Sequence, residues 1–387
     1  MDEGSNYTTL FSAMQTKLLI IINNDTFFLS HRKDVALAAQ AAGYDVTIVT
    51  RNNGKHDEIR QLGLRVLDLK MNPTGMNPLQ DLKTVWFLYR LYRNEHPDIV
   101  HLVGPKLNLW GTLAARMAGI RNVVSAVSGL GVIFNGKGIG RIMPYAFRFT
   151  NRVKNLRAIF QNEEDKATYL NYKIVRESQC RFIKGSGINL NDFAYSPEPV
   201  EGRIKIMFTA RMIREKGIDV ILEAAHLLYS DYKDRILFEL CGGLTDVHRS
   251  NYVSPDVLNS FGDSDYFSWL GMRDDVHDLL VDSHIFIFPS YYGEGLPKSC
   301  IEANAIGRPI ITTDSVGCKD TVIDGYNGYI IPIRDAQALA DKLRILIEDK
   351  TLRQQMGRNA RKYAEDNFSI EDVIKRHLDI YAEFKSL

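Results

Sequence analysis

The chain has 387 residues, of which 45% are hydrophobic and 25% are charged, as is typical of a soluble globular protein. This length is too great for one ordinary core and predicts two domains of roughly 150 to 200 residues each. The formal net charge is +1, so no overall field attracts nucleic acid or a membrane. No apolar run approaches the roughly 18 to 20 residues that a membrane-spanning helix needs.

The N-terminus and the cysteines carry no processing or metal signal. Residues 1–15 lack a basic region followed by an apolar core, so we treat them as an extension rather than a signal peptide. The cysteines show neither metal-type nor redox spacing, which predicts reduced core residues of a cytosolic protein. They are Cys180, Cys241, Cys300 and Cys318.

From Lys17 onward, short apolar runs alternate with helical patterns, which is typical of parallel sheets covered by helices. In the first half we expect strands at 18–22, 45–49, 65–69, 98–103, 122–127, 158–161 and 182–184. Helices are expected at 32–42, 79–95 and 107–118, with another helical stretch between the strands at 122–127 and 158–161. These elements predict a doubly wound α/β domain over residues 17–190.

Residues 185–203 are rich in glycine, asparagine and proline, which indicates a linker. A second series, at 203–369, has expected strands at 204–209, 236–241, 267–270, 285–288, 309–312 and 328–331. Its helices should begin near residues 216, 255, 274, 297, 336 and 352, and a final amphipathic helix should span 370–384. Ligands of open α/β sheets bind beyond the carboxyl ends of the strands, which predicts a site in a cleft between two such domains.

Residues 284–304, in which a strand is followed by a glycine turn and the start of a helix, are the most informative about function. The strand at 285–288 is buried on both faces by its composition, and a glycine turn at 293–295 follows it. Pro297 stands where a first helical residue belongs. Free backbone amides and the positive end of the helix dipole make such a junction a binding site for a phosphate or another anion.

Two carboxylates, Glu294 in the turn and Glu302 on the helix, lie on either side of this predicted anion-binding site in the sequence. Because carboxylates repel phosphate, we expect them to accept hydrogen bonds from sugar hydroxyls. The alternative is that Glu294 is a solvated turn residue and that Glu302 forms only a surface ion pair with Lys298 at i,i+4 spacing.

Two cations follow the first strand of the second domain. Arg211 and Lys216 lie at the same carboxyl edge as the glycine turn. Cations at two strand ends can converge on one anion, so we expect them to clamp a diphosphate. The alternative for each residue alone is a solvated loop position.

Other motifs carry weaker signals. Asp263 and Asp265 match an Asp-x-Asp metal motif but lie in a polar loop before a strand, and no His/Cys/Asp cluster has ligand spacing, so no metal is predicted. The glycines at 136, 138 and 140 do not match the dinucleotide fingerprint, which disfavours a nicotinamide enzyme. His101, at a strand end, is a candidate acid or base, with a capping or core histidine as the alternative.

The charge distribution is uneven. Between Asp98 and Glu163 there is no acidic residue, while lysines and arginines continue throughout. Aromatic residues lie among the later cations at Phe134, Tyr145, Phe147 and Phe149. This pattern predicts that residues 134–157 contact anionic lipid at a membrane surface, with 85–93 as a second such stretch. The alternative is domain packing with arginines that extend to solvent.

Taken together, these residues resemble glycosyltransferase family 4, the retaining transferases of the GT-B architecture. The resemblance extends from Lys17 over nearly the whole chain. Glu294 and Glu302 look like the family's two glutamates separated by seven residues, and Arg211 and Lys216 look like its donor-phosphate pair. The resemblance implies two Rossmann-like domains facing a cleft: an acceptor-binding domain at 17–190, completed by a 370–387 helix that crosses back, and a nucleotide-sugar-binding domain at 203–369.

Three stretches, at 24–32, 128–131 and 317–320, look like the branch that builds bacterial O-antigen and capsule repeat units on undecaprenyl diphosphate. That branch implies a UDP-sugar donor, often an N-acetylhexosamine, and a lipid-linked saccharide acceptor. It implies a cytoplasmic protein that is peripheral on the inner face of the membrane. The UDP-sugar would be a co-substrate, so neither a cofactor nor a nucleic-acid partner is expected.

By position, the resemblance implies that Arg211 and Lys216 neutralise the leaving diphosphate, that Glu294 holds the donor sugar and that Glu302 holds the ribose. On the donor side it adds Gly295, Leu296, Pro297, Gly271 and Arg273. On the acceptor side the candidates are His31, Arg32, His101, Ser128 and Gly129. Many family members have a histidine where Ser128 stands, so the role of that histidine does not transfer to this chain.

Two other functions are weighed against the transferase. A UDP-sugar epimerase of the same architecture would act without an acceptor. A sugar-binding or scaffold protein with a dead site would keep its role when Glu294 or Lys216 is replaced.

Overall fold

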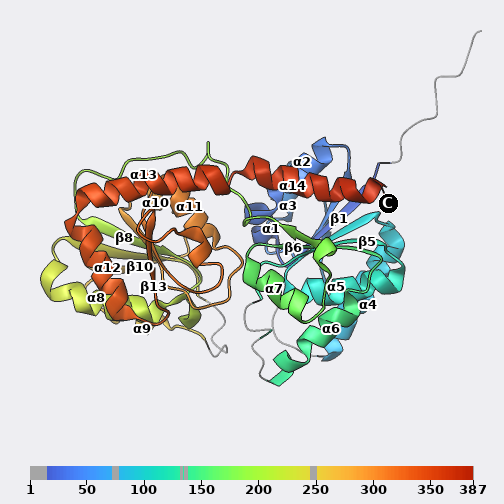
Figure 1. Cartoon of the computed structure of the whole chain (residues 1–387), viewed down its shortest axis with the longest axis horizontal. Coiled ribbons are helices and arrows are strands. Elements are labelled where there is room, and N and C mark those ends of the chain that lie inside the picture. The colour runs from blue at the N-terminus through green and yellow to red at the C-terminus, as the bar shows by residue number, and fades with distance from the viewer. Residues whose placement is uncertain (1–14, 72–77, 131–133, 135–137, 245–250, 387) are drawn as a thin grey trace, which may run out of the picture. The chain divides into compact units, whose positions relative to one another are not determined.

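The structure is a computed structural model that describes residues 15–71, 78–130, 134, 138–244 and 251–386 (Figure 1). Gly136, Lys137 and the first residues of the N-terminal extension lie outside this part. The chain divides into two compact units: residues 1–124, 153–156 and 383–387 form the first, and residues 125–152 and 157–382 form the second. The domain bounds at 17–190 and 203–369 stay a prediction.

The first sheet has seven strands in the order β3-β2-β1-β4-β5-β6-β7. Its strands are β1 Lys17–Ile22, β2 Asp45–Thr50, β3 Arg65–Asp68, β4 Ile99–Val103, β5 Asn122–Ala126, β6 Asn155–Phe160 and β7 Cys180–Phe182. The strand β1 pairs in parallel with β2 and β4, and its residues from Leu18 to Ile22 are buried. The expected strands of this half are confirmed in position, although the ends of several are shifted.

The helices of this half are α1 Asp25–His31, α2 Lys33–Ala41, α3 His56–Gln61, α4 Pro78–Glu95, α5 Pro105–Ala118, α6 Met143–Thr150 and α7 Glu163–Asn171. The helix expected at 32–42 is preceded by another, α1, because the Asn24 side chain accepts from the Phe27 amide at 2.7 Å and starts a helix there. Arg32 (φ −136°) leaves the helical region and separates α1 from α2.

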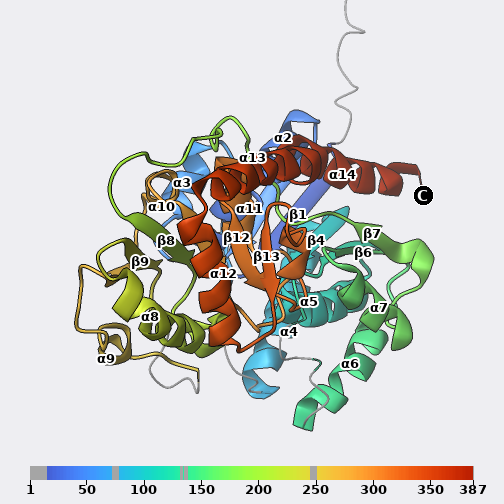
Figure 2. The same cartoon turned by 60° about the vertical axis from the view of Figure 1, so that its left-hand side comes forward.

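The second sheet has six strands in the order β10-β9-β8-β11-β12-β13. They are β8 Ile204–Thr209, β9 Ile236–Cys241, β10 Phe267–Gly271, β11 Ile285–Phe288, β12 Ile310–Thr313 and β13 Gly328–Ile331. The helices are α8 Ile218–Tyr232, α9 Pro255–Leu258, α10 Val276–Val281, α11 Lys298–Ile306, α12 Ala336–Glu348, α13 Lys350–Asn367 and α14 Ile370–Glu383. Of these, α8 and α12 pack side by side (Figures 1 and 2). The chain thus has two parallel, Rossmann-like sheets, as expected.

Residues just after α14 belong to the first unit. Phe384 is 7% exposed, and the Lys385 ammonium lies 4.1 Å from the centroid of the Tyr44 ring. Phe384 and Lys385 also line a pocket of about 720 Å³ together with Lys17 and Asp45, which begin β1 and β2. The end of the described chain therefore packs at the amino edge of the first sheet.

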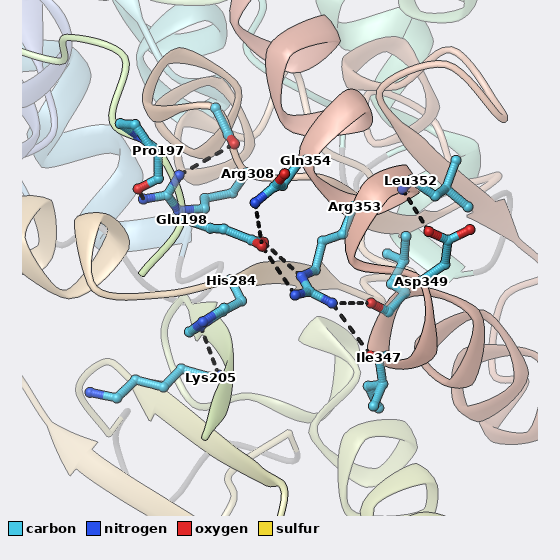
Figure 3. A network of polar contacts seen from close by, with 12 residues as sticks. Pro197, Glu198, Lys205, His284, Arg308, Ile347, Asp349, Leu352, Arg353 and Gln354 are labelled. Atoms are coloured by element: carbon cyan, nitrogen blue, oxygen red, sulfur yellow. Dashed lines mark hydrogen bonds and ion pairs between the residues drawn. The ribbon is translucent and has the colours of Figure 1, made fainter. Parts of the chain in front are cut away.

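A buried ion pair anchors part of the expected linker within the second unit (Figure 3). Glu198 accepts from Arg353 Nε at 2.7 Å and from Arg353 Nη2 at 3.1 Å, and the two side chains are 6% and 4% exposed. Gln354 also donates to Glu198 at 3.2 Å. The segment around Glu198 is therefore fixed to α13, although its composition indicated a linker.

Arg308 and His284 extend this network (Figure 3). The Arg308 guanidinium is fully buried and donates to the backbone carbonyls of Ser196 at 2.6 Å and Val281 at 2.7 Å. Burial lowers the pKa of Arg308 to about 10, and the nearby Glu198 carboxylate opposes this shift. Burial likewise lowers the pKa of His284 to about 4, so the neutral ring accepts from the Lys205 amide at 3.1 Å.

We expect Arg353→Ala to lower the free energy of unfolding by about 3 to 5 kcal/mol, because it leaves the Glu198 carboxylate buried without its charge partner. Urea unfolding measures this loss. The combined replacement Glu198→Leu with Arg353→Met should recover most of it, since no unpaired charge then remains buried.

The matched control is Arg235→Ala. Arg235 pairs with Glu348 through side chains that are 51% and 53% exposed, so its loss should cost less than about 1 kcal/mol. Equal losses for Arg353→Ala and Arg235→Ala would contradict the role given to the buried pair.

Candidate active site

An ion pair joins the loops that follow two neighbouring strands of the second sheet. β8 and β11 pair in parallel through Ile206 and Ile285, so both strands end at the same edge. Lys216 lies in the loop after β8, and its ammonium contacts the Glu294 carboxylate in the loop after β11. Their side chains are 10% and 16% exposed. The structure therefore brings together a cation and a carboxylate that the sequence singled out.

Local sequence explains how these two loops approach. Gly217 has φ +86°, and a Cβ there would overlap the Pro289 carbonyl oxygen. Glycine at this position ends the short 3₁₀ turn Arg214–Lys216 and lets it lie against the second loop. It also explains why α8 begins at Ile218 rather than near residue 216.

Ser290 ties the loops together and holds Glu294. Its hydroxyl donates to the Glu215 carbonyl at 3.1 Å and lies 3.4 Å from Glu294 Oε1. The hydroxyls of Thr313 and Ser315, at the end of β12, both donate to the Ser290 carbonyl. The sequence analysis missed these hydroxyl groups, although each lies at or just after the end of a buried strand, where functional residues of parallel sheets gather.

The start of α11 differs from the expectation in two respects. Pro297 is the N-cap residue (φ −62°, ψ 118°) and α11 begins at Lys298, so Pro297 is not the first helical residue. Its φ suits the end of an extended turn as well as a helix. The Leu296 amide donates to Gln161 Oε1 at 2.9 Å and is not one of the free amides predicted here.

Glu302 lies on α11, on the turn that follows Lys298. Burial raises the pKa of Glu302, and the charges of Lys298 and His277 oppose part of this shift. A buried carboxyl group is stabilised by hydrogen bonds from neutral hydroxyls, because these bonds satisfy its oxygens without burying a second charge.

The remaining donor-side candidates lie at the same carboxyl edge. Arg211 is exposed and follows β8. Gly271 ends β10 with φ +70°, and its carbonyl accepts from the Gly242 amide at 2.8 Å. Arg273 forms an ion pair with Asp275 at 2.5 Å, with both side chains partly exposed.

The acceptor-side candidates fall into two groups. Ser128 and Gly129 lie in the second unit against the glycine turn, where a Cβ on Gly129 would be 2.6 Å from the Gly293 carbonyl oxygen. His31, Arg32 and His101 belong to the first unit.

His101 is fully buried within β4, which fits the alternative of a core histidine. Arg32 is 2% exposed and donates to the His31 carbonyl at 2.8 Å. His31 Nδ1 lies 2.6 Å from the Ser30 hydroxyl.

Carboxylates in the described ranges do not gather into a metal centre: no group of three or more His, Cys, Asp or Glu residues there could hold an ion. Of the Asp-x-Asp pair, Asp263 accepts from the Tyr229 hydroxyl at 3.0 Å and from the Asp265 amide at 3.1 Å. These contacts give Asp263 a structural role within its loop.

Two family models match this chain. The model of glycosyl transferases group 1 matches residues 193–363, and the model described as glycosyl transferase 4-like matches residues 17–162. The first match includes Lys216, Glu294 and Glu302. The two matches together cover most of residues 17–363, and the chain is a glycosyltransferase with the GT-B fold of two Rossmann-like sheets.

Individual relatives are also similar over most of their length. The N,N'-diacetylbacillosaminyl-diphospho-undecaprenol alpha-1,3-N-acetylgalactosaminyltransferase of Campylobacter jejuni is 29% identical, over 92% of this chain and 97% of the relative. The UDP-Gal:alpha-D-GlcNAc-diphosphoundecaprenol alpha-1,3-galactosyltransferase of Escherichia coli is 24% identical, over 88% of this chain and 89% of the relative.

Solved structures share the fold. A glycosyltransferase from Rickettsia africae has a TM-score of 0.73 at 20% identity and covers 96% of this chain and 99% of its own. Anabaena HepE in complex with UDP and glucose has a TM-score of 0.76 at 17% identity and covers 96% of this chain and 100% of its own.

We expect Lys216→Ala and Glu294→Ala each to lower the rate of sugar transfer by about a hundredfold or more, because each removes a preorganised charge from the site. Initial rates with a competent donor and acceptor measure this. Arg214→Ala is the control, since Arg214 lies in the same turn but pairs with Asp219 through side chains that are 49% and 50% exposed. Wild-type rates for Lys216→Ala would contradict the catalytic role given to this ion pair.

Proposed function

We propose that this glycosyltransferase moves a sugar from a UDP-sugar to an undecaprenyl-diphosphate-linked saccharide, with retention of the α configuration, as a member of family 4. The observation that carries the proposal is the Lys216–Glu294 pair at the carboxyl edge of the second sheet, with Glu302 on the helix that follows. The names of the Campylobacter and Escherichia relatives support the lipid-linked acceptor. A hexose or an N-acetylhexosamine is the transferred sugar in this proposal.

Donor binding would exchange the partners of Lys216. Without a ligand its ammonium pairs with Glu294, and a diphosphate would take over this cation together with the exposed Arg211. Glu294 is then available for the hydroxyls of the donor sugar. Glu302 would accept from the ribose hydroxyls, and the backbone at 271–273 would meet the base.

For the chemical step we propose front-side attack. The acceptor hydroxyl forms a bond to the anomeric carbon as the bond to UDP breaks, and an oxygen of the departing diphosphate takes the hydroxyl proton. Lys216 and Arg211 stabilise the negative charge that develops on the leaving group. A glycosyl adduct trapped on any side chain of this protein would contradict this step.

The direct test incubates the protein with a panel of UDP-sugars and a synthetic saccharide-diphosphate-lipid acceptor, with product masses read by mass spectrometry. We expect one hexose or N-acetylhexosamine to be added to the acceptor. Consumption of a UDP-sugar with release of free product in the absence of acceptor would favour the epimerase instead. An unmodified acceptor with every UDP-sugar, from folded protein, would contradict the proposal.

We also propose that α6 contacts the inner face of the bacterial membrane. Ile142, Tyr145 and Phe149 follow one another at helical spacing and are 64%, 65% and 51% exposed, with the exposed Arg148 among them. Phe147 is buried and belongs to the core, and the half-buried Phe134 ring packs against it with 5.6 Å between the ring centroids.

A second exposed stripe supports membrane contact independently. On α4, Leu79, Leu82 and Trp86 are 71%, 66% and 57% exposed. Exposed apolar side chains beside cations are typical of helices that lie in an anionic lipid surface. Within the described ranges, helices fall short of the length and apolarity needed to span a bilayer.

We expect the protein to float with vesicles that contain phosphatidylglycerol and to do so less with vesicles of phosphatidylcholine alone. Tyr145→Ala with Phe149→Ala should reduce flotation several-fold, because apolar burial and charge attraction act together. Leu227→Ala with Ile345→Ala is the control, since these side chains are 38% and 40% exposed on α8 and α12. Equal flotation of both double variants would contradict the assignment to α6.

A further inference from the structure

The junction between β6 and α7 contacts the glycine turn of the candidate active site. Gln161 directly follows β6, and Asn162 is the N-cap of α7, where its Oδ1 accepts from the Asp165 amide at 2.7 Å. The two side chains are 7% and 1% exposed. Both residues and the turn belong to the second unit. The proposed function gives neither residue a role.

Gln161 and Asn162 bind the backbone of the turn. Gln161 Oε1 accepts from the Leu296 amide at 2.9 Å in buried surroundings. Asn162 Nδ2 donates to Asp165 Oδ2 at 3.0 Å and also lies 3.4 Å from the carbonyl oxygens of both Glu294 and Gly295. Neighbouring side chains therefore hold the peptide groups on both sides of Gly295. A buried amide that lost such a partner would be left unsatisfied, which is rare and costly.

The glycine at position 295 is explained by this contact. A Cβ on Gly295 would overlap Gln161 Oε1 and would lie 2.8 Å from the Ser128 carbonyl carbon. Gly295 does not have the left-handed backbone that favours glycine, so glycine is needed here for space. The same turn is approached from its other side by Gly317, whose Cβ would overlap the Gly295 carbonyl oxygen.

We propose that Gln161 and Asn162 are positioning residues for the sugar donor. They fix the peptide from Glu294 to Leu296, and this fixes the direction in which the Glu294 carboxylate leaves the turn toward Lys216. The inference rests on the proposed function, in which this turn binds the donor. Neither side chain needs to touch the reacting atoms.

The first test follows the Leu296 amide by hydrogen exchange at single-residue resolution in the ligand-free protein. Gln161→Met keeps the length of the side chain but removes the acceptor, so exchange should quicken about tenfold or more. Gln161→Glu keeps an acceptor oxygen and should retain the protection. Gln40→Met is the control, because Gln40 makes a remote hydrogen bond to the Gly63 carbonyl at 3.0 Å. Unchanged protection in Gln161→Met would overturn the proposal.

The second test separates positioning from general stability by steady-state kinetics. In Gln161→Met, kcat/KM for the nucleotide sugar should fall about tenfold, while the KM for the lipid acceptor stays as in the wild type. Gln161→Glu should lie closer to the wild type than Gln161→Met does. The reverse order, or an equal change in both KM values, would overturn the proposal. If Gln161→Met does not fold, Gln161→Asn removes the same contact by shortening the side chain.

The two tests distinguish a failure of the positioning role from a failure of the proposed function. Hydrogen exchange needs no substrate, so it decides whether Gln161 holds the turn even when the wild type transfers no sugar. A wild type that transfers sugar, beside a Gln161→Met variant with unchanged donor kinetics, would overturn only the positioning role. Absence of transfer by the wild type would overturn the function while leaving the exchange result to stand on its own.

Discussion

The ion pair between Lys216 and Glu294 is the interaction on which the candidate site depends. Each group is mostly buried and needs an opposite charge while no ligand is bound, since an unpaired charge in such surroundings is costly. Parallel pairing of β8 with β11 places both loops at one edge, and Gly217 lets their backbones meet. The same two groups can then serve a diphosphate and a sugar, because a ligand that carries negative charge and hydroxyls offers each of them a new partner.

Much of the fold could be predicted because its strands are short apolar runs bounded by turn residues. The strand β11 begins and ends where the sequence placed it, since a strand buried on both faces has few polar positions to blur its limits. The helices α3 and α7 were missed because each is short and mostly polar, so no apolar stripe marks it.

The parts of the site that depend on nearby strands and turns in the sequence were predicted. The contacts between residues far apart in the sequence were missed. Lys216 and Glu294 each follow a strand, so the rule for parallel sheets placed them at one edge. Gln161 and Leu296 are 135 residues apart in the sequence, and Glu198 and Arg353 are 155 apart. Nothing in the composition near Gln161 or Glu198 indicates such a partner, because both contacts arise only when the backbone has been folded.

Because residues 383–387 belong to the same unit as residues 1–124, that unit cannot be completed until the ribosome has made these late residues. Phe384 is buried there and Lys385 lies on Tyr44, so the surface that they cover stays exposed until these two residues emerge from the ribosome. At usual translation speeds this delay is on the order of tens of seconds. A chaperone that covers this surface during the interval would protect the growing chain from aggregation, and the synthesis of Phe384 and Lys385 would end the need for it.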